Sequence, residues 1–351
     1  MTDLTLLFAT AVEKRASDLH IISGYEPTVR ILGRLIRIRN AGTLTGKETE
    51  ALLSSILTDQ QKSELQENRE LDFGYQWNTY RFRVNYYYAQ GGLAAAFRLI
   101  PKRIPTIDEL HLPNAFHKFT QLSDGFILFT GPTGEGKSTT IASLLQEINI
   151  SQEQHIVTIE DPIEYVFESG RSIISQRELH SDTYSLKRAL RAVLREDPNV
   201  VLVGEMRDFD TISSALTIAE TGHLVFSTLH TSSTHEAINR IIDVFPAAQQ
   251  NQIRSQLASV LKAVVTQHLL PSSDGKSLVP AVEVLINNSA VSALIRDAKT
   301  HMIDNVIETS EEEDMILLEK NLAKLYQTGV IAKETALAAA QRKTLIKKFI
   351  G

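Results

Sequence analysis

One segment of this chain constrains its fold more than any other: GFILFTGPTGEGKSTTIASLL, residues 125–145. An apolar run typical of a strand leads into a glycine-rich turn with the spacing G-x-x-x-x-G-K-S, and a helix-compatible stretch follows. In this context the spacing predicts a phosphate-binding loop. Its glycines allow backbone N–H groups to surround phosphate oxygens, and the N-terminus of the helix adds partial positive charge. The segment therefore predicts a nucleotide site at the end of a strand.

The loop supplies the candidate ATP-binding residues. Lys137 directs a positive charge toward the β and γ phosphates, and Ser138 is positioned to ligate Mg²⁺. Glu135 is unusual in such a loop, because a carboxylate that faced the phosphates would cost free energy. We expect it to point outward, to solvent or to a neighbouring element. The predicted nucleotide-binding set is Gly131, Pro132, Thr133, Gly134, Glu135, Gly136, Lys137, Ser138 and Thr139.

Further short β-rich runs follow the loop along the chain. They are HIVTIED (155–161), VVLVGEM (200–206) and HLVFSTLH (223–230), and helix-compatible segments separate them. Apolar strands alternating with helices indicate a parallel sheet that is covered on both faces. We therefore assign residues 121–285 to an α/β ATPase core and residues 286–351 to a mostly helical C-terminal region.

Carboxylates and a histidine stand at the ends of these runs, where ligands gather in doubly wound sheets. Glu205 is the first candidate for polarising the attacking water, and Glu164 is the second; either acid can also support Mg²⁺ through water. Gly204 occupies the usual place of a magnesium aspartate, so metal support is expected mainly from Ser138 and the phosphates. His230 is a candidate sensor of the γ-phosphate. Helix capping is the alternative role for the acids, and a structural role is the alternative for His230.

Residues 1–100 are predicted to form a separate, smaller α/β domain. Its expected elements are an amphipathic helix (4–15), a half-buried hairpin in TVRILGRLIRIR (28–39), one helix from Gly46 to about Asn68 with Thr45 as its N-cap, and antiparallel strands in 71–100.

The next stretch contains three prolines, Pro101, Pro105 and Pro113. Because proline fixes its φ angle and has no N–H to donate, this stretch predicts an extended linker over residues 101–120.

The length and composition indicate a chain of more than one domain without a membrane span. A chain of 351 residues is too long for one ordinary core, and no apolar run approaches the ~20 residues that span a bilayer. The N-terminal stretch has no signal-peptide pattern, and the absence of cysteine excludes disulfides and thiolate metal sites. Both features fit a cytoplasmic protein, and a net charge of −6 argues weakly against a nucleic-acid-coating surface.

Four segments, in this order, resemble motifs of the secretion ATPases of type II and type IV pilus systems. GPTGEGKST resembles their Walker A motif, TIEDPIEY their Asp box, VGEMRD their Walker B motif and GHLVFSTLHT their His box. The segments ASDLHIISG (16–24) and INRIIDVFP (238–246) extend the likeness to roughly residues 4–300. Within this superfamily the sequence is most similar to the branch that retracts type IV pili.

The resemblance implies a hexameric, ring-forming motor with a PAS-like N-terminal domain and a RecA-like ATPase domain, between which ATP binds. Arg81, Arg83 and Arg98 match the N-terminal arginines that reach the nucleotide in this family. A guanidinium group suits phosphate oxygens, although alternating arginines also suit the solvated face of a strand. The implied partner is a pilus platform protein of the inner membrane, and the implied location is the cytoplasmic face of that membrane.

Three departures from the family pattern concern the motor's exact role. Glu135 replaces the usual serine, AVSALIRD (290–297) matches the retraction signature only loosely, and the last ~50 residues keep few familiar positions. Another motor role in the same machinery is therefore the alternative to retraction. A RecA-like nucleic-acid translocase is a more distant alternative, which would need a basic channel with aromatic side chains. Tyr86 and its neighbours Tyr87 and Tyr88 stand beside the arginines, but a packing role suits a β-rich segment better.

Overall fold

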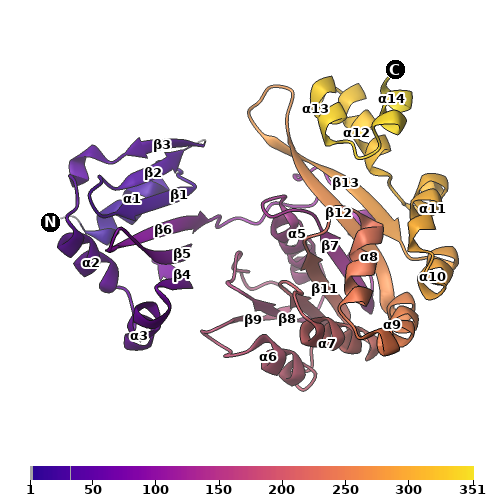
Figure 1. Ribbon diagram of the computed structural model, residues 1–351, viewed down its shortest axis with the longest axis horizontal. Helices are drawn as coiled ribbons and strands as arrows, with labels where there is room; N and C mark the ends of the chain where they lie inside the picture. Colours follow the sequence, from indigo (N-terminus) through magenta and orange to yellow (C-terminus); the bar gives the residue numbers. More distant parts are fainter. Residues whose placement is uncertain (1–2, 32) are drawn as a thin grey trace. The chain divides into compact units, whose positions relative to one another are not determined.

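The computed structural model describes residues 3–31 and 33–351, and this chain divides into two compact units (Figure 1). The first unit extends to Arg103 and includes the separate segment Pro162–Val166. The second unit comprises Ile104–Asp161 and Phe167–Gly351. Each unit combines helices with a sheet, so the predicted α/β class is confirmed.

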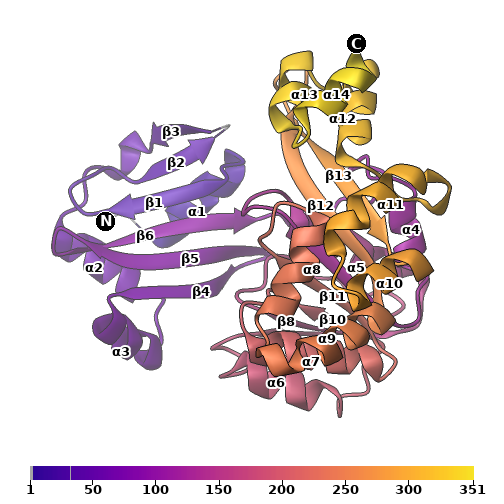
Figure 2. The ribbon, with the colours of Figure 1, turned by 45° about the vertical axis from the view of Figure 1, so that its right-hand side comes forward.

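The first unit contains a six-stranded antiparallel sheet, whose strands follow one another in the order β3-β2-β1-β6-β5-β4 (Figure 2). Its strands are β1 (Asp18–Ile22), β2 (Thr28–Ile31), β3 (Arg34–Arg37), β4 (Glu70–Trp77), β5 (Tyr80–Ala89) and β6 (Gly92–Ile100). Its helices are α1 (Leu4–Glu13), a 3₁₀ turn (Arg39–Ala41), α2 (Gly46–Ser54) and α3 (Asp59–Asn68).

Side chains alternate along β5 as a half-buried strand requires. Phe82, Val84 and Tyr86 are buried, whereas Arg81 and Arg83, which alternate with them, lie on the other face. The ring of Phe8 on α1 stacks on Phe82 at 4.7 Å and meets Phe97 of β6 edge-on at 5.1 Å. The core of this unit therefore lies between the helices and one face of the sheet.

The helix expected over residues 46–68 is in fact two helices. Thr45 caps α2 in a capping box with Glu48, as the sequence predicts. A second box, formed by Thr58 with Gln61, starts α3, and the chain is not helical between Ser54 and Asp59. The predicted hairpin exists as β2 and β3, but β3 is exposed throughout and not half-buried. Leu32, which belongs to the same prediction, lies outside the described residues.

The second unit is built on a seven-stranded sheet. Its strands are β7 (Gly125–Thr130), β8 (His155–Glu160), β9 (Ile173–Glu178), β10 (Val200–Val203), β11 (Leu224–Leu229), β12 (Leu261–Pro271) and β13 (Leu278–Ile286). Their order is β13-β12-β7-β11-β10-β8-β9. The strands from β12 to β9 are parallel, and β13 runs antiparallel at the edge. The predicted parallel sheet is thus confirmed, with the antiparallel edge strand as an addition.

Helices cover both faces of this sheet, which explains why β7 and β11 are buried along their whole length. One face packs on α6 (Leu186–Val193), α7 (Phe209–Glu220), α8 (Thr234–Asp243), α9 (Ala247–Val260) and α10 (Ser289–Arg296). The other face packs on α4 (Ala115–Phe119) and α5 (Lys137–Ser151). Figure 1 shows α5 and α8 on opposite sides of β7.

The proline-rich stretch expected as a linker contains packed structure. The second unit begins at Ile104, and Ile107 is buried in the same cluster as Phe116 and Phe119. The ring of Phe116 lies 6.2 Å from that of Phe129 on β7. Apolar side chains between the prolines therefore anchor residues 104–120 to the sheet.

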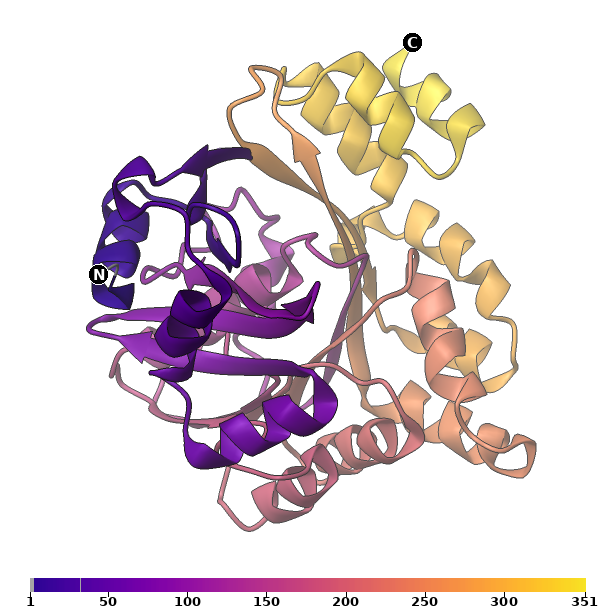
Figure 3. The same ribbon diagram turned by 60° about the vertical axis from the view of Figure 1, so that its left-hand side comes forward.

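Three of the last helices, α12 (Leu318–Gln327), α13 (Lys333–Ala339) and α14 (Lys343–Ile350), pack on the hairpin of β12 and β13, as Figure 3 shows in yellow and orange. Before them, α11 (Ile303–Thr309) packs beside α10, and 3₁₀ turns lie at Thr300–Met302 and Glu311–Glu313. Among residues 3–31 and 33–351, no helix is both long and apolar enough to cross a membrane.

A buried cluster of charges ties these helices to the sheet. The guanidinium of Arg342 lies 3.0 Å from Glu319 on α12, 3.5 Å from Asp304 on α11 and 3.8 Å from Glu283 on β13. Glu319 is fully buried, and burial raises the pKa of Glu283. His235 of α8 also contacts Asp304, at 3.2 Å, and this hydrogen bond raises the pKa of His235.

We expect Arg342→Ala to destabilise this region by about 3 kcal/mol, because it leaves buried carboxylates without their cation. Urea unfolding, together with amide exchange in α12, measures the effect. Restoring the original net charge of the cluster with Arg342→Ala plus Glu319→Gln should recover part of the loss. Arg296→Ala, which removes an exposed arginine, is the matched control and should change little. Equal stability of the two arginine variants would contradict a structural role for the cluster.

Candidate nucleotide-binding site

Three predicted site residues meet at the carboxyl ends of adjacent parallel strands. The loop after β7 carries Lys137, the residue after β11 is His230, and Glu205 follows β10. Lys137 Nζ lies 3.4 Å from His230 Nδ1, and His230 Nε2 lies 3.2 Å from Glu205 Oε1. In this geometry Nδ1 can accept from the ammonium while Nε2 donates to the carboxylate. The structure thus brings the lysine, the histidine and the acid into one chain of contacts.

Hydroxyl groups hold the three strand ends in line. Thr130 at the end of β7 donates through Oγ1 to Thr231 O at 2.7 Å and accepts from Thr231 N at 3.0 Å. Between β11 and β10, Ser227 Oγ donates to Val203 O at 2.8 Å, and Thr228 Oγ1 donates to Gly204 O at 2.6 Å. Side-chain bonds therefore continue the ladder where the regular pairing stops.

The glycines of the loop adopt backbone conformations that other residues rarely reach. Gly131, Gly134 and Gly136 have φ values of +138°, +87° and +78°. Gly136 is the N-cap of α5, so the loop turns directly into the first turn of that helix. Lys137 is buried, and its Nζ donates to the carbonyls of Gly131 at 2.6 Å and Pro132 at 2.8 Å. The lysine thus lies across the mouth of the loop, close to where phosphate oxygens are expected.

Glu135 turns toward a neighbouring element, which was one of the two expected orientations. Its carboxylate accepts a hydrogen bond from the backbone N–H of Leu269 on β12, and its carbonyl accepts from Gln267 Nε2 at 2.8 Å. Gln267 Oε1 in turn accepts from Thr140 Oγ1 of α5 at 2.9 Å. One face of the loop is therefore fastened to β12.

The electrostatics around Glu205 favour its ionised form. Arg207 Nη2 donates to Glu205 Oε2 at 2.7 Å, and this bond holds the pKa of Glu205 below its usual value. The contact with His230 at the other carboxylate oxygen acts in the same direction. Because the acid stays ionised and both oxygens are engaged, it is suited to orienting a water more than to direct metal binding.

The residues present fit Mg²⁺ as an ion that arrives with the phosphates. Within the described part of the chain, no group of three His, Asp, Glu or Cys side chains is arranged to hold a metal. Ser138 lies in the first turn of α5, where a single hydroxyl can complete a shell of phosphate and water oxygens. A Cβ at Gly204 would lie 3.3 Å from Ile159 O, so a side chain there would press on β8. This crowding gives a structural reason for the missing aspartate.

Comparison with known proteins places the chain in a family. The model of the type II/IV secretion system protein family matches residues 2–349. The chain belongs to this family. The resemblance inferred from the separated motifs is thereby confirmed.

Relatives and a solved structure agree over nearly the whole chain. A twitching motility protein of Neisseria gonorrhoeae is 44% identical over 96% of this chain and 90% of its own length. The type IV pilus retraction ATPase PilT of Pseudomonas aeruginosa is 42% identical over 97% of this chain and 98% of its own. A crystal structure of the pilus retraction motor PilT with bound ADP superposes with a TM-score of 0.92 and 41% identity, and covers 99% of this chain and all of that one.

The remaining predicted site residues of this family member lie in the first unit. Arg83 of β5 is directly opposite Arg98 of β6, and Arg81 lies on the same face of the sheet. Arg98 Nε donates to Asp18 Oδ1 at 3.0 Å, and Arg83 Nη1 lies 3.7 Å from Glu164 Oε1. The structure therefore groups the arginines and Glu164 with one another, and their roles toward a nucleotide stay predictions.

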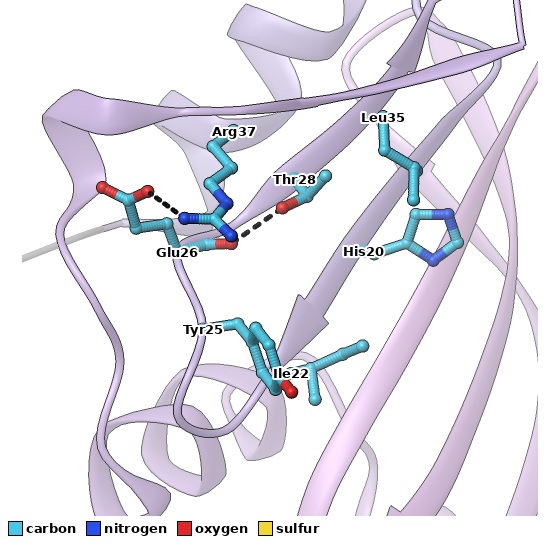
Figure 4. Close-up of a pocket in the computed structure, with 7 residues that line it drawn as sticks. All are labelled: His20, Ile22, Tyr25, Glu26, Thr28, Leu35 and Arg37. Carbon is cyan, nitrogen blue, oxygen red and sulfur yellow. Dashed lines mark hydrogen bonds and ion pairs between the residues drawn. The ribbon is translucent and has the colours of Figure 1, made fainter.

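A separate cavity of about 450 Å³ occurs in the first unit. Its described lining consists of His20, Ile22, Tyr25, Glu26, Thr28, Leu35 and Arg37 (Figure 4). Glu26 and Arg37 form an ion pair at 3.9 Å, and burial lowers the pKa of His20. This lining combines apolar side chains with an internally paired charge. It offers no glycine-rich phosphate cradle, so we assign the nucleotide to the second unit.

Sequence reasoning missed two residues that shape the site. Arg207 stands two positions after Glu205, and the local motif VGEMRD contained this signal. Gln267 carried no such signal, because it reaches the loop from a strand about 130 positions away in the chain.

We expect Gly131→Ala to abolish nucleotide binding. An ideally placed Cβ at this position would lie 2.4 Å from Gln267 O, and the backbone conformation is nearly exclusive to glycine. Gly134→Ala is the matched control, because Gly134 also has a positive φ but has nothing within 4 Å of its Cβ position. That variant should weaken ADP binding about tenfold or less, from a strain of about 1 kcal/mol. Calorimetric titration with ADP measures both, and equal losses would show that the contact with β12 is unimportant.

Proposed function

We propose that this chain hydrolyses ATP to power the retraction of type IV pili, the pilus disassembly that drives twitching motility. The contact chain from Lys137 through His230 to Glu205, at the mouth of the phosphate-binding loop, carries the proposal. It occurs in a chain that is 44% and 42% identical to a twitching motility protein and a pilus retraction ATPase over almost its full length.

Binding of the triphosphate begins with the loop. Backbone N–H groups of Gly131 and of residues 133–139 surround the β and γ phosphates, and the N-terminus of α5 adds partial positive charge. Lys137 exchanges its hydrogen bonds to the loop carbonyls for bonds to phosphate oxygens. Ser138 and the phosphates would hold Mg²⁺, which would neutralise part of the charge on the phosphates.

Hydrolysis then requires an oriented water. The ionised Glu205 accepts a hydrogen bond from that water and aligns it with the γ-phosphorus, while Arg207 keeps the carboxylate in place. His230 lies between this carboxylate and Lys137 and contacts both. When the γ-phosphate is lost, a movement of the imidazole would therefore alter the positions of both groups. Glu164 is the second candidate for water activation, and Arg81, Arg83 and Arg98 are candidates for stabilising the transferred charge.

The wider features of the motor are part of the same proposal. We assign ATP and Mg²⁺ as ligands, a homo-hexameric ring as the active assembly, and a pilus platform protein of the inner membrane as the partner. The working location is the cytoplasmic face of that membrane. The domain division into 1–100, 101–120, 121–285 and 286–351 also remains a proposal for the functional parts of the motor. In it, residues 101–120 connect the first two parts, although residues 104–120 pack on the second unit.

We expect Lys137→Ala and Glu205→Gln each to lower ATP turnover at least about a hundredfold, because they remove phosphate binding and water orientation. Lys137→Ala should also abolish ADP binding, whereas Glu205→Gln should retain it. Lys187→Ala and Glu220→Gln are matched controls on the same unit. Turnover close to that of the unaltered protein in either site variant, with an intact fold by circular dichroism, would remove that residue from the site.

Deleting the gene in its host separates retraction from the alternatives. Retraction predicts excess surface pili and the loss of twitching motility. An assembly motor predicts bare cells, and an accessory motor predicts little change in pilus number. For a nucleic-acid translocase, filter binding of single-stranded DNA at about 0.1 M salt is the direct measurement. The buried ring of Tyr86, whose hydroxyl donates to Leu53 O at 3.0 Å, belongs to the core and favours the pilus motor over this alternative.

A further inference from the structure

The phosphate-binding loop meets β12 at the point where that strand loses a neighbour. The parallel pairing of β7 with β12 ends at Thr130 and Thr266. Beyond this point β12 continues to Pro271, while β7 has already turned into the loop. The edge of β12 that faced β7 therefore needs other hydrogen-bond partners from residue 267 onward.

Glu135 supplies one of those partners. Leu269 lies three residues beyond Thr266, the last residue of β12 that pairs with β7, so β7 offers its N–H no acceptor. The backbone N–H of Leu269 donates to the carboxylate of Glu135. A carboxylate that accepts from a backbone N–H forms a charge-assisted bond, which is stronger than a neutral one. The side chain thus takes the place of the strand that has ended.

Three further contacts hold the loop against β12. Gln267 Nε2 donates to the carbonyl of Glu135 at 2.8 Å, so the same loop residue is held through both its main chain and its side chain. At the start of the loop, Gly131 lies so close to Gln267 that a Cβ would be 2.4 Å from its carbonyl oxygen. Gly136, at the end, would bring a Cβ within 3.0 Å of Gln267 Nε2. The loop is therefore in contact with β12 at its beginning, middle and end.

We propose that Glu135 is a positioning residue that braces the phosphate-binding loop on β12, so that its backbone donors are in place before nucleotide binds. This inference rests on the proposed function, because it concerns the same ATP site. A loop that is already ordered loses less conformational entropy on binding. The charge of Glu135 acts in the opposite direction, since it repels the phosphates. Replacing the residue by alanine and by glutamine separates the two effects.

Glu135→Ala removes the brace and should raise the Kd for ADP about tenfold. The KM for ATP should rise by a similar factor while kcat changes less than about twofold, because a brace present in both ground and transition states affects binding uniformly. Glu135→Ser should behave like alanine, since its hydroxyl is too short to span the same gap. Glu135→Gln keeps an oxygen for the Leu269 N–H and loses the charge, so its Kd should equal or fall below that of the unaltered protein.

Amide exchange at Leu269 and along residues 133–137, measured without nucleotide, reports the brace directly. Exchange should quicken in Glu135→Ala and stay slow in Glu135→Gln. Glu334→Ala removes an exposed carboxylate elsewhere in the second unit and controls for net charge. The proposal is overturned if alanine and glutamine variants bind ADP alike, or if exchange at Leu269 is the same in both.

Failure of this inference is distinguishable from failure of the proposed function. If Lys137→Ala abolishes ADP binding but Glu135→Ala leaves Kd and KM unchanged, the ATP site stands and the brace is rejected. If Lys137→Ala binds ADP normally, the assignment of the site itself is wrong. A low thermal midpoint of the alanine variant leaves the test intact, because the glutamine variant must still keep both the fold and slow exchange at Leu269.

Discussion

The site depends on the parallel alignment of β7, β11 and β10, because each of its central groups follows the end of one of these strands. A strand shifted by one residue moves by about 3.3 Å and turns its side chains to the other face. Such a shift would break the contact between Lys137 and His230 at 3.4 Å and that between His230 and Glu205 at 3.2 Å. The hydroxyls of Thr130, Ser227 and Thr228 add side-chain hydrogen bonds that resist this shift at the ends of the backbone pairing.

The same alignment of strands brings the charged groups of the site together. Glu205 is the acid in direct contact with His230 and Arg207, and Lys137 approaches the other side of the imidazole. The hydrogen bond from Arg207 keeps the pKa of this acid low, so its charge is available at neutral pH. A water-orienting role follows from this, since a carboxylate with a low pKa is a weak proton acceptor. The pair Glu205 and Arg207 is therefore one functional unit, although the sequence analysis singled out only the acid.

Local patterns could predict the parts of the structure that local physics determines. The spacing of glycines and the strand before them located the loop, and the apolar runs identified the parallel sheet. The interruption between α2 and α3 was not predicted, but its signal is present in the sequence, because Thr58 and Gln61 have the spacing of a capping box. Contacts between distant segments left no such trace. Neither the bond from Gln267 to Glu135 nor the three acids around Arg342 follows from spacing, because each is created by the packing of the whole sheet.

These contacts between distant segments involve the elements that support the site, above all β12 and its hairpin with β13. The strand β12 contacts the phosphate-binding loop through Gln267 and Leu269, and its hairpin with β13 carries the C-terminal helices. Gln341 Nε2, just before α14, donates to Ser232 O at 2.5 Å, only two residues beyond His230. The C-terminal region therefore touches the supports of both the loop and the histidine. A displacement of these helices would therefore move the support of the loop and that of the histidine together, without any change in the residues that face the nucleotide.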